Sequence, residues 1–256
     1  MLITRVIPCL LLRRAALVKS VRFKNPTYVG DPINTVRIFN EKEVDELVFL
    51  DITATVESRP PPLDLIAEIS RECFMPFGYG GGIRTLEDVR QVLATGAEKA
   101  IINTAAWKQP ELVAEAARQF GSQSIVVSVD VKRSLFGKPQ VVVASARENT
   151  KLDPVTYAKR MEELGAGEIL LTSVDREGTF TGYDLELVRQ IAQAVRIPVV
   201  ANGGAGNLQH LREVVRAGGA SAAAAGSLFV FQGSHRAVLI NYPEREELDR
   251  LFENEL

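Results

Sequence analysis

The sequence predicts a single (β/α)8 barrel, or TIM barrel, made of two similar halves. The chain has 256 residues, close to the roughly 250 residues of a typical (β/α)8 barrel. Short runs of valine, isoleucine and leucine alternate with amphipathic helical patterns, as expected for a parallel sheet covered by helices. Segments 76–96 and 198–218 resemble each other at an offset of 122 residues (203 − 81 = 122). We therefore predict one domain, residues 1–256, with an internal half-barrel duplication.

The predicted elements follow the order strand, then helix, through both halves. Asp31 is a suitable N-cap and Pro32 a suitable first residue for the first helix, over 31–42. An extra hairpin is expected over 132–143, after the fifth strand. The strands are predicted at 3–12, 46–52, 75–79, 99–103, 124–131, 168–172, 197–201 and 220–225. The other helices are predicted at 62–73, 86–94, 110–120, 153–164, 184–195, 208–217 and 235–240.

Charge and composition exclude several classes of protein. The formal net charge is −2, with 46% hydrophobic and 24% charged residues, so no positive field favours nucleic acid. Cys9 and Cys73 have no metal-binding spacing, which suits a reducing compartment. The longest apolar runs are too short to cross a bilayer, and we expect no signal segment in residues 1–5. We expect a cytoplasmic protein with no nucleic-acid or membrane partner, no metal and no cofactor.

Glycine-rich strand ends predict two phosphate sites. In a barrel, ligands bind where strands end, and glycine backbone can approach an anion closely. The alternative is that these glycines only make tight turns, but two pairs related by the repeat favour phosphate. The first cradle is Gly81-Gly82 with Asn103-Thr104, and the second is Gly203-Gly204 with Gly226-Ser227.

Asp130 is the candidate general acid or base, because it ends the fifth predicted strand. The alternative is a structural partner for Lys132 or Arg133. Asp51 and Asp175 lie at comparable positions, and we leave open whether they bind ligand hydroxyls or cap loops. His210 and His235 fall in predicted helices, and no Ser-His or Cys-His arrangement indicates hydrolase or thiol chemistry. Arg13-Arg14 is expected to be a solvated loop charge, or alternatively to meet a phosphate.

These residues resemble a known family along nearly the whole chain. The chain is similar to the cyclase subunit of imidazole glycerol phosphate synthase, a barrel of the ribulose-phosphate-binding type. The resemblance rests on segments 5–9, 30–32, 45–54, 80–84, 102–106, 120–123 and 165–173. It implies a bisphosphorylated ribonucleotide substrate, a glutaminase partner on the opposite face of the barrel, and passage of ammonia through the interior. It also implies ligand binding by Lys19, on a mobile loop, and by Thr172, Asp175 and Gly178.

The resemblance further implies a charged ammonia gate at the opposite face, formed by Arg5, Glu46, Lys99 and Glu168. Four charges at strand beginnings are costly inside a barrel unless they pair with one another. An ion cluster that serves stability alone is the alternative.

One departure from the family concerns catalysis. The family's catalytic pair is two aspartates at the ends of strands one and five, matching position 11 and Asp130, but residue 11 is Leu11. Leucine cannot transfer a proton, and losing a general acid or base costs about 10²–10⁴-fold in rate. Asn202 replaces a usual serine, and Glu177 replaces a usual aspartate. The loop over 12–16 lacks the acidic residue and the glycine expected there.

Segments 226–233 and 241–243 resemble a branch of the family that accompanies surface-polysaccharide genes. That branch implies amidation of a nucleotide-linked sugar, with a paired glutaminase and a third protein, a sugar amidotransferase. Our leading hypothesis is therefore a cyclase-subunit paralogue that receives ammonia and binds a phosphorylated or nucleotide ligand. The second hypothesis is a genuine imidazole glycerol phosphate synthase cyclase of histidine biosynthesis. The third is a non-catalytic glutaminase scaffold.

Overall fold

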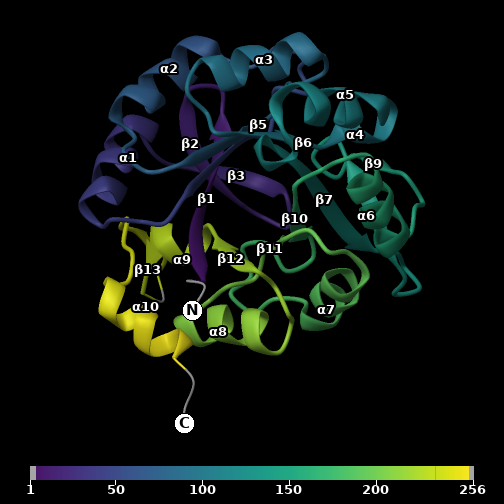
Figure 1. Cartoon of the computed structure of the whole chain (residues 1–256). Coiled ribbons are helices and arrows are strands. Elements are labelled where there is room, and N and C mark those ends of the chain that lie inside the picture. The colour runs from purple at the N-terminus through teal and green to yellow at the C-terminus, as the bar shows by residue number, and fades with distance from the viewer. Residues whose placement is uncertain (1–3, 234, 254–256) are drawn as a thin grey trace.

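The computed structural model describes residues 4–233 and 235–253, and within them eight parallel strands close into a barrel (Figure 1). Each strand pairs in parallel with the next along the chain, and the last pairs with the first. The predicted (β/α)8 fold is confirmed; Ile3, at the start of the first predicted strand, lies outside the described residues. The barrel strands are β1 (Arg5–Arg13), β4 (Leu47–Asp51), β5 (Phe77–Gly80), β6 (Lys99–Ile102), β7 (Ile125–Arg133), β10 (Glu168–Ser173), β11 (Val199–Asn202) and β12 (Ala222–Ala225).

Helices surround the strands on the outside of the barrel (Figure 1). The Asp31 side chain accepts a hydrogen bond from the Asn34 amide and caps α1, as predicted. Asp153 caps α6 in the same way, with proline at the next position, so the first helix of each half begins alike. The helices are α1 (Pro32–Glu41), α2 (Leu63–Glu72), α3 (Leu86–Ala94), α4 (Thr104–Lys108), α5 (Glu111–Phe120), α6 (Pro154–Glu163), α7 (Leu185–Ala194), α8 (Leu208–Arg216), α9 (Ser227–Val230) and α10 (Arg245–Phe252), with a 3-10 turn, η1 (Ser122–Ser124). No helix among the described residues has the length and apolar character needed to cross a bilayer.

The helix predicted over 235–240 is wrong. A short hairpin, β13 (Phe231–Gln232) and β14 (Ala237–Val238), occupies this region, and His235 lies in its turn. Val238 and Leu239 are about half exposed, so the apolar run at the end of this segment does not form the buried stripe of a helix. The outer layer is completed instead by α10, which the sequence patterns did not predict.

Two hairpins extend the barrel at equivalent places in the two halves. β2 (Ala16–Val21) and β3 (Lys24–Gly30) follow β1, and β8 (Pro139–Val143) and β9 (Glu148–Asn149) follow β7. The hairpin predicted over 132–143 is formed by the end of β7 and by β8, whereas β9 and the first hairpin were not predicted. Arg22 and Phe23 form the first turn with φ of 53° and 60°, although neither is one of the residues that usually mark such a turn. The sequence therefore carries no ordinary hairpin signal there.

The strand register confirms that Leu11 and Asp130 are equivalent positions. Leu11 pairs with Leu50, and Asp130 pairs with Thr172. Leu50 and Thr172 are related by the repeat offset of 122 (172 − 50 = 122). Inward-facing side chains below them form a buried interior cluster, distinct from the larger core between sheet and helices: Ile7, Cys9, Val48, Ile101, Val126, Leu170, Val200, Ala222 and Ala224.

Candidate active site

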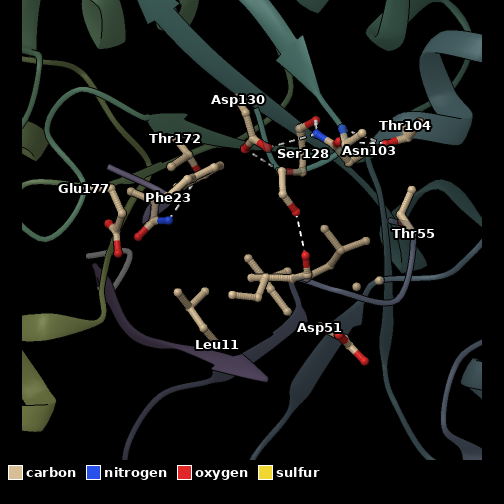
Figure 2. A pocket seen from close by; sticks show the side chains of 18 of the residues that line it. Leu11, Phe23, Asp51, Thr55, Asn103, Thr104, Ser128, Asp130, Thr172 and Glu177 are labelled. Carbon is tan, nitrogen blue, oxygen red and sulfur yellow. Dashed lines mark hydrogen bonds between the residues drawn. The ribbon is translucent and has the colours of Figure 1, made fainter. Parts of the chain in front are cut away.

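A pocket opens at the carboxyl ends of the barrel strands, where sequence analysis placed the site (Figure 2). Leu11 and Asp130 come from β1 and β7, while Phe23 and Ser145 come from the hairpin insertions. Of the predicted site residues, the pocket brings together Leu11, Asp51, Gly81, Asn103, Thr104, Asp130 and Thr172. The polar and aromatic residues at its wall that were not predicted to bind are Ser20, Phe23, Thr55, Ser128, Ser145, Glu177 and Asn202.

Asp130 is buried at this pocket and is held by neighbouring donors. Asn103 Nδ2 donates to its Oδ2 at 3.2 Å, and Ser128 Oγ donates to its Oδ1 at 3.2 Å. Burial nevertheless dominates and raises the pKa of Asp130 to about 7, with the Glu177 carboxylate adding to the rise. A carboxyl group with a pKa near neutrality can both accept and release a proton, as a general acid or base must.

This raised pKa predicts that the contribution of Asp130 to protein stability falls as pH rises from about 4 to about 7. The folded state holds the Asp130 proton more tightly than the unfolded state, so this contribution is greatest at the acid end. Between the two pKa values it falls by at most about 1.4 kcal/mol per pH unit. In urea unfolding at pH 5 and pH 7.5, we expect Asp130→Asn to lose much of this dependence. Asp64→Asn, at an exposed position on α2, should keep it; equal pH profiles for the two variants would contradict the assignment.

Leu11 faces Asp130 across the pocket (Figure 2). It lies at the apolar wall together with Leu50 and Ile101, and is only 5% exposed. These aliphatic side chains cannot donate or accept a proton in catalysis. Of the two strand-end positions related by the repeat, only Asp130 therefore carries a carboxyl group.

Asn202 carries an unsatisfied buried oxygen at the same pocket. Its Nδ2 donates to Thr172 Oγ1 at 3.2 Å, and the Thr172 side chain beside Asp130 acts to lower the pKa of that carboxyl group. With the amide nitrogen engaged in this way, Asn202 Oδ1 has no hydrogen-bond partner within the described part of the chain. A ligand N–H or O–H group would supply the missing donor.

The first predicted cradle is assembled, and a hairpin loop covers part of it. Gly81 and Gly82 have φ of 122° and 75°, and a Cβ on Gly82 would lie 2.6 Å from the Arg59 carbonyl oxygen. Glycine is therefore required by the turn itself. Thr104 Oγ1 accepts from the Ala144 amide at 3.0 Å, and the Gly82 amide donates to Thr55 Oγ1 at 3.4 Å. Thr104 Oγ1 and the Gly82 amide therefore already have hydrogen-bond partners within the chain.

The second predicted cradle is associated with a buried ammonium group. Gly203 and Gly204 have φ of 91° and 112°, and a Cβ on Gly226 would collide with Lys19 Nζ. Lys19 Nζ is 3.2 Å from Glu177 Oε1, and both side chains are buried. Lys19 belongs to β2, so the hairpin places its charge beside the cradle. An anion bound there would meet a positive charge as well as glycine backbone.

Three other predicted ligand-binding residues have local structural partners. Asp51 Oδ1 accepts from the amides of Thr53 and Ala54 at 2.9 and 3.0 Å, and Figure 2 shows its carboxylate turned away from Asp130. Asp175 Oδ2 accepts from the Arg133 amide at 2.8 Å. Gly178 lies under the first hairpin, where a Cβ would be 2.4 Å from the Ser20 carbonyl oxygen. Their observed contacts organise loops around the pocket.

The four predicted gate residues form a closed ring of ion pairs at the opposite end of the barrel interior. Arg5 bonds to Glu46 at 2.5 Å and to Glu168 at 2.6 Å. Lys99 bonds to the same two carboxylates at 2.7 and 3.0 Å. The Glu46 side chain is 4% exposed, so the ring compensates charges that burial would otherwise make very costly.

Comparison of the sequence with known proteins shows the family to which the chain belongs. The sequence model of the family described as histidine biosynthesis protein matches residues 5–236. A Pseudomonas aeruginosa relative with the provisional name imidazole glycerol phosphate synthase subunit hisF2 is 51% identical over 245 residues, 96% of this chain and 98% of the relative. The subunit HisF of Alkaliphilus metalliredigens is 49% identical over 229 residues, 90% of this chain and 91% of the relative. The chain therefore belongs to the histidine biosynthesis protein family, as a relative of the HisF subunit of imidazole glycerol phosphate synthase.

Proposed function

We propose that this protein is a cytoplasmic cyclase-subunit paralogue that receives ammonia from a glutaminase. The glutaminase binds at the face that carries the charged ring, and ammonia reaches the Asp130 pocket through the barrel interior. There it serves the amidation of a phosphorylated or nucleotide-linked sugar for surface polysaccharide, together with a separate sugar amidotransferase. The observation that carries the proposal is that a closed ring of ion pairs at one end of the barrel occurs together with a pocket at the other end that has Leu11 where the family has its second catalytic aspartate.

The ring and the interior cluster support the ammonia route. Glu46 and Glu168 are buried, and such pairs add little stability compared with apolar residues of the same volume. The presence of these buried ion pairs at one end of the barrel is therefore better explained by a functional role than by stability. The interior between ring and pocket is lined by aliphatic side chains and Cys9, which favour neutral ammonia over ammonium because burying a charge is expensive.

The pocket supports an acceptor other than the cyclase substrate. Cyclisation in the family relies on two aspartates, and the apolar Leu11 removes one of them. Asp130, Thr172 and the unsatisfied oxygen of Asn202 remain available to bind hydrogen-bond donors. This combination fits a site that holds ammonia or its acceptor but does not carry out the whole ring closure.

Genuine cyclase activity is the second candidate. Asp130 with a pKa near 7 and the two glycine cradles favour it. This function predicts turnover of the aminoimidazole-forming substrate with ammonium salts by the unaltered protein. An inactive protein with an intact fold would argue against it.

The decisive test uses a separately purified candidate glutaminase subunit of the HisH type. We expect the two proteins to co-elute in size-exclusion chromatography, and we expect this chain to increase the rate of glutamine hydrolysis. Arg5→Glu reverses one charge of the ring and should weaken both effects, whereas Arg90→Glu on the outer surface of α3 should leave them unchanged. A glutaminase that neither binds the chain nor responds to it would rule out the proposal.

A further inference from the structure

A second, outer pocket of about 430 Å³ adjoins the Asp130 pocket at the barrel mouth. Phe23, Ile52 and Ser145 line both pockets, so the two share a wall. The volume lies within the range of about 300–1,000 Å³ that is typical of small-molecule sites. A ligand anchored near Asp130 could extend into this outer space without crossing the barrel.

The outer pocket has uncompensated positive charge. Arg13 and Arg147 line it, and both are exposed without a carboxylate partner among the residues that the structure describes. The one carboxylate in its wall, Glu57, already bonds to Arg59 at 2.7 Å and lies 3.6 Å from Arg14. An anion entering the pocket therefore meets two guanidinium groups, which suit the geometry of phosphate oxygens.

The other half of the barrel provides an internal comparison. Arg133 ends β7 as Arg13 ends β1, one position beyond Lys132, the register equivalent of Arg13 (132 − 13 = 119). Arg133 Nη2 donates to Asp184 Oδ2 at 2.9 Å, so its charge is used within the fold. Arg13 has no such partner in the described chain and is available to a ligand.

Much of the remaining wall is apolar, and Ser145 in this wall belongs to a strained loop. Phe23, Pro26, Ile52 and Val56 supply an aromatic and aliphatic surface. Ala144, Ser145 and Ala146 have φ of 53°, 57° and 59°, and Ser145 Oγ donates to the Ile52 carbonyl oxygen at 2.6 Å. Left-handed backbone is disfavoured for residues other than glycine, so three such residues in succession are strained. Backbone strain of this kind clusters at ligand-binding sites. Here it lies in the loop between the two pockets.

We propose that the outer pocket binds the nucleoside diphosphate part of the ligand, with the diphosphate on Arg13 and Arg147 and the base against Phe23 and Pro26. The group to be amidated then lies toward Asp130. This inference rests on the proposed function for the identity of the ligand, because it names the part of a nucleotide-linked sugar that the barrel mouth recognises. The glycine cradles are not required for it.

Titration calorimetry with UDP, ADP and pyrophosphate tests the site directly. We expect both nucleotides to bind with a Kd below about 1 mM, and the Arg13→Ala/Arg147→Ala double variant to bind them at least about tenfold more weakly, because charge-assisted hydrogen bonds are lost. Phe23→Ala should weaken nucleotide binding but leave pyrophosphate binding unchanged. Arg90→Ala, on the outer surface of α3, is the matched control and should bind like the unaltered protein.

Two results would overturn the inference: no nucleotide binding at concentrations of about 10 mM, or equal binding by the double variant and the Arg90→Ala control. The glutaminase assay separates this failure from failure of the proposed function. Loss of nucleotide binding with intact glutaminase stimulation refutes only the outer site. Nucleotide binding that depends on both arginines, without any glutaminase response, supports the outer site and refutes the ammonia route.

Discussion

Replacing Leu11 by aspartate is expected to raise cyclase turnover with ammonium salts by about 10²–10⁴-fold, the usual contribution of one general acid or base. Leu11 occupies the position equivalent to Asp130 by strand register, so the new carboxylate would face the existing one across the pocket. Two carboxyl groups at one site titrate as a coupled pair, and one of them remains protonated to higher pH. The pair could then supply an acid and a base together. Turnover of the aminoimidazole-forming substrate measures the effect.

Leu11→Asn is the matched control, because it has nearly the same shape as the aspartate variant and cannot exchange a proton in the same way. We expect it to remain as slow as the unaltered protein. Equal gains in both variants would show that polarity, and not proton transfer, limits the reaction. High activity in the unaltered protein would instead show that Asp130 is sufficient and would favour the histidine-pathway function.

Replacing Lys99 by methionine is expected to lower the free energy of unfolding by about 3–5 kcal/mol, the cost of breaking a buried ion pair from one side. Lys99 contacts both Glu46 and Glu168, and its own side chain is only 16% exposed. Without it, Arg5 alone must compensate two buried carboxylates. Urea unfolding of the isolated protein measures the loss.

Arg37→Met provides the comparison for the ring. Arg37 bonds to Glu72 through two nitrogens at 3.0 and 2.8 Å, but both side chains are exposed to solvent. Exposed pairs contribute about 0–1 kcal/mol. Similar small losses in the two variants would contradict the view that the ring holds costly buried charge.

Sequence pattern was sufficient for the barrel and for the position of its site. Near-continuous aliphatic strands and capped helices are local signals, so the eight barrel strands and the capped start of α1 could be predicted. The strand-end rule then located Asp130 and the glycine turns at one mouth of the barrel. The repeat further related Leu11 to Asp130, and the observed register agrees with this relation.

Contacts between distant segments could not be predicted in the same way. The pairing of Lys19 with Glu177 joins residues 158 positions apart and depends on a hairpin that has no ordinary turn signal. The predicted helix over 235–240 failed because local apolar content does not reveal whether a segment will be buried. Arg13 and Arg147 likewise line one pocket only because the end of β1 and the loop after β8, from opposite halves, come together at the same opening.

The sequence by itself determined the duplicated barrel, the glycine turns, the surviving Asp130 and the missing acid at Leu11, because each depends on residue type and position along the chain. Only the tertiary structure decided which charges are compensated. Burial and neighbours set the pKa of Asp130, close the ring of Arg5, Glu46, Lys99 and Glu168, and leave the oxygen of Asn202 without a partner. These are properties of the surroundings of a group, which exist only once distant parts of the chain have come together.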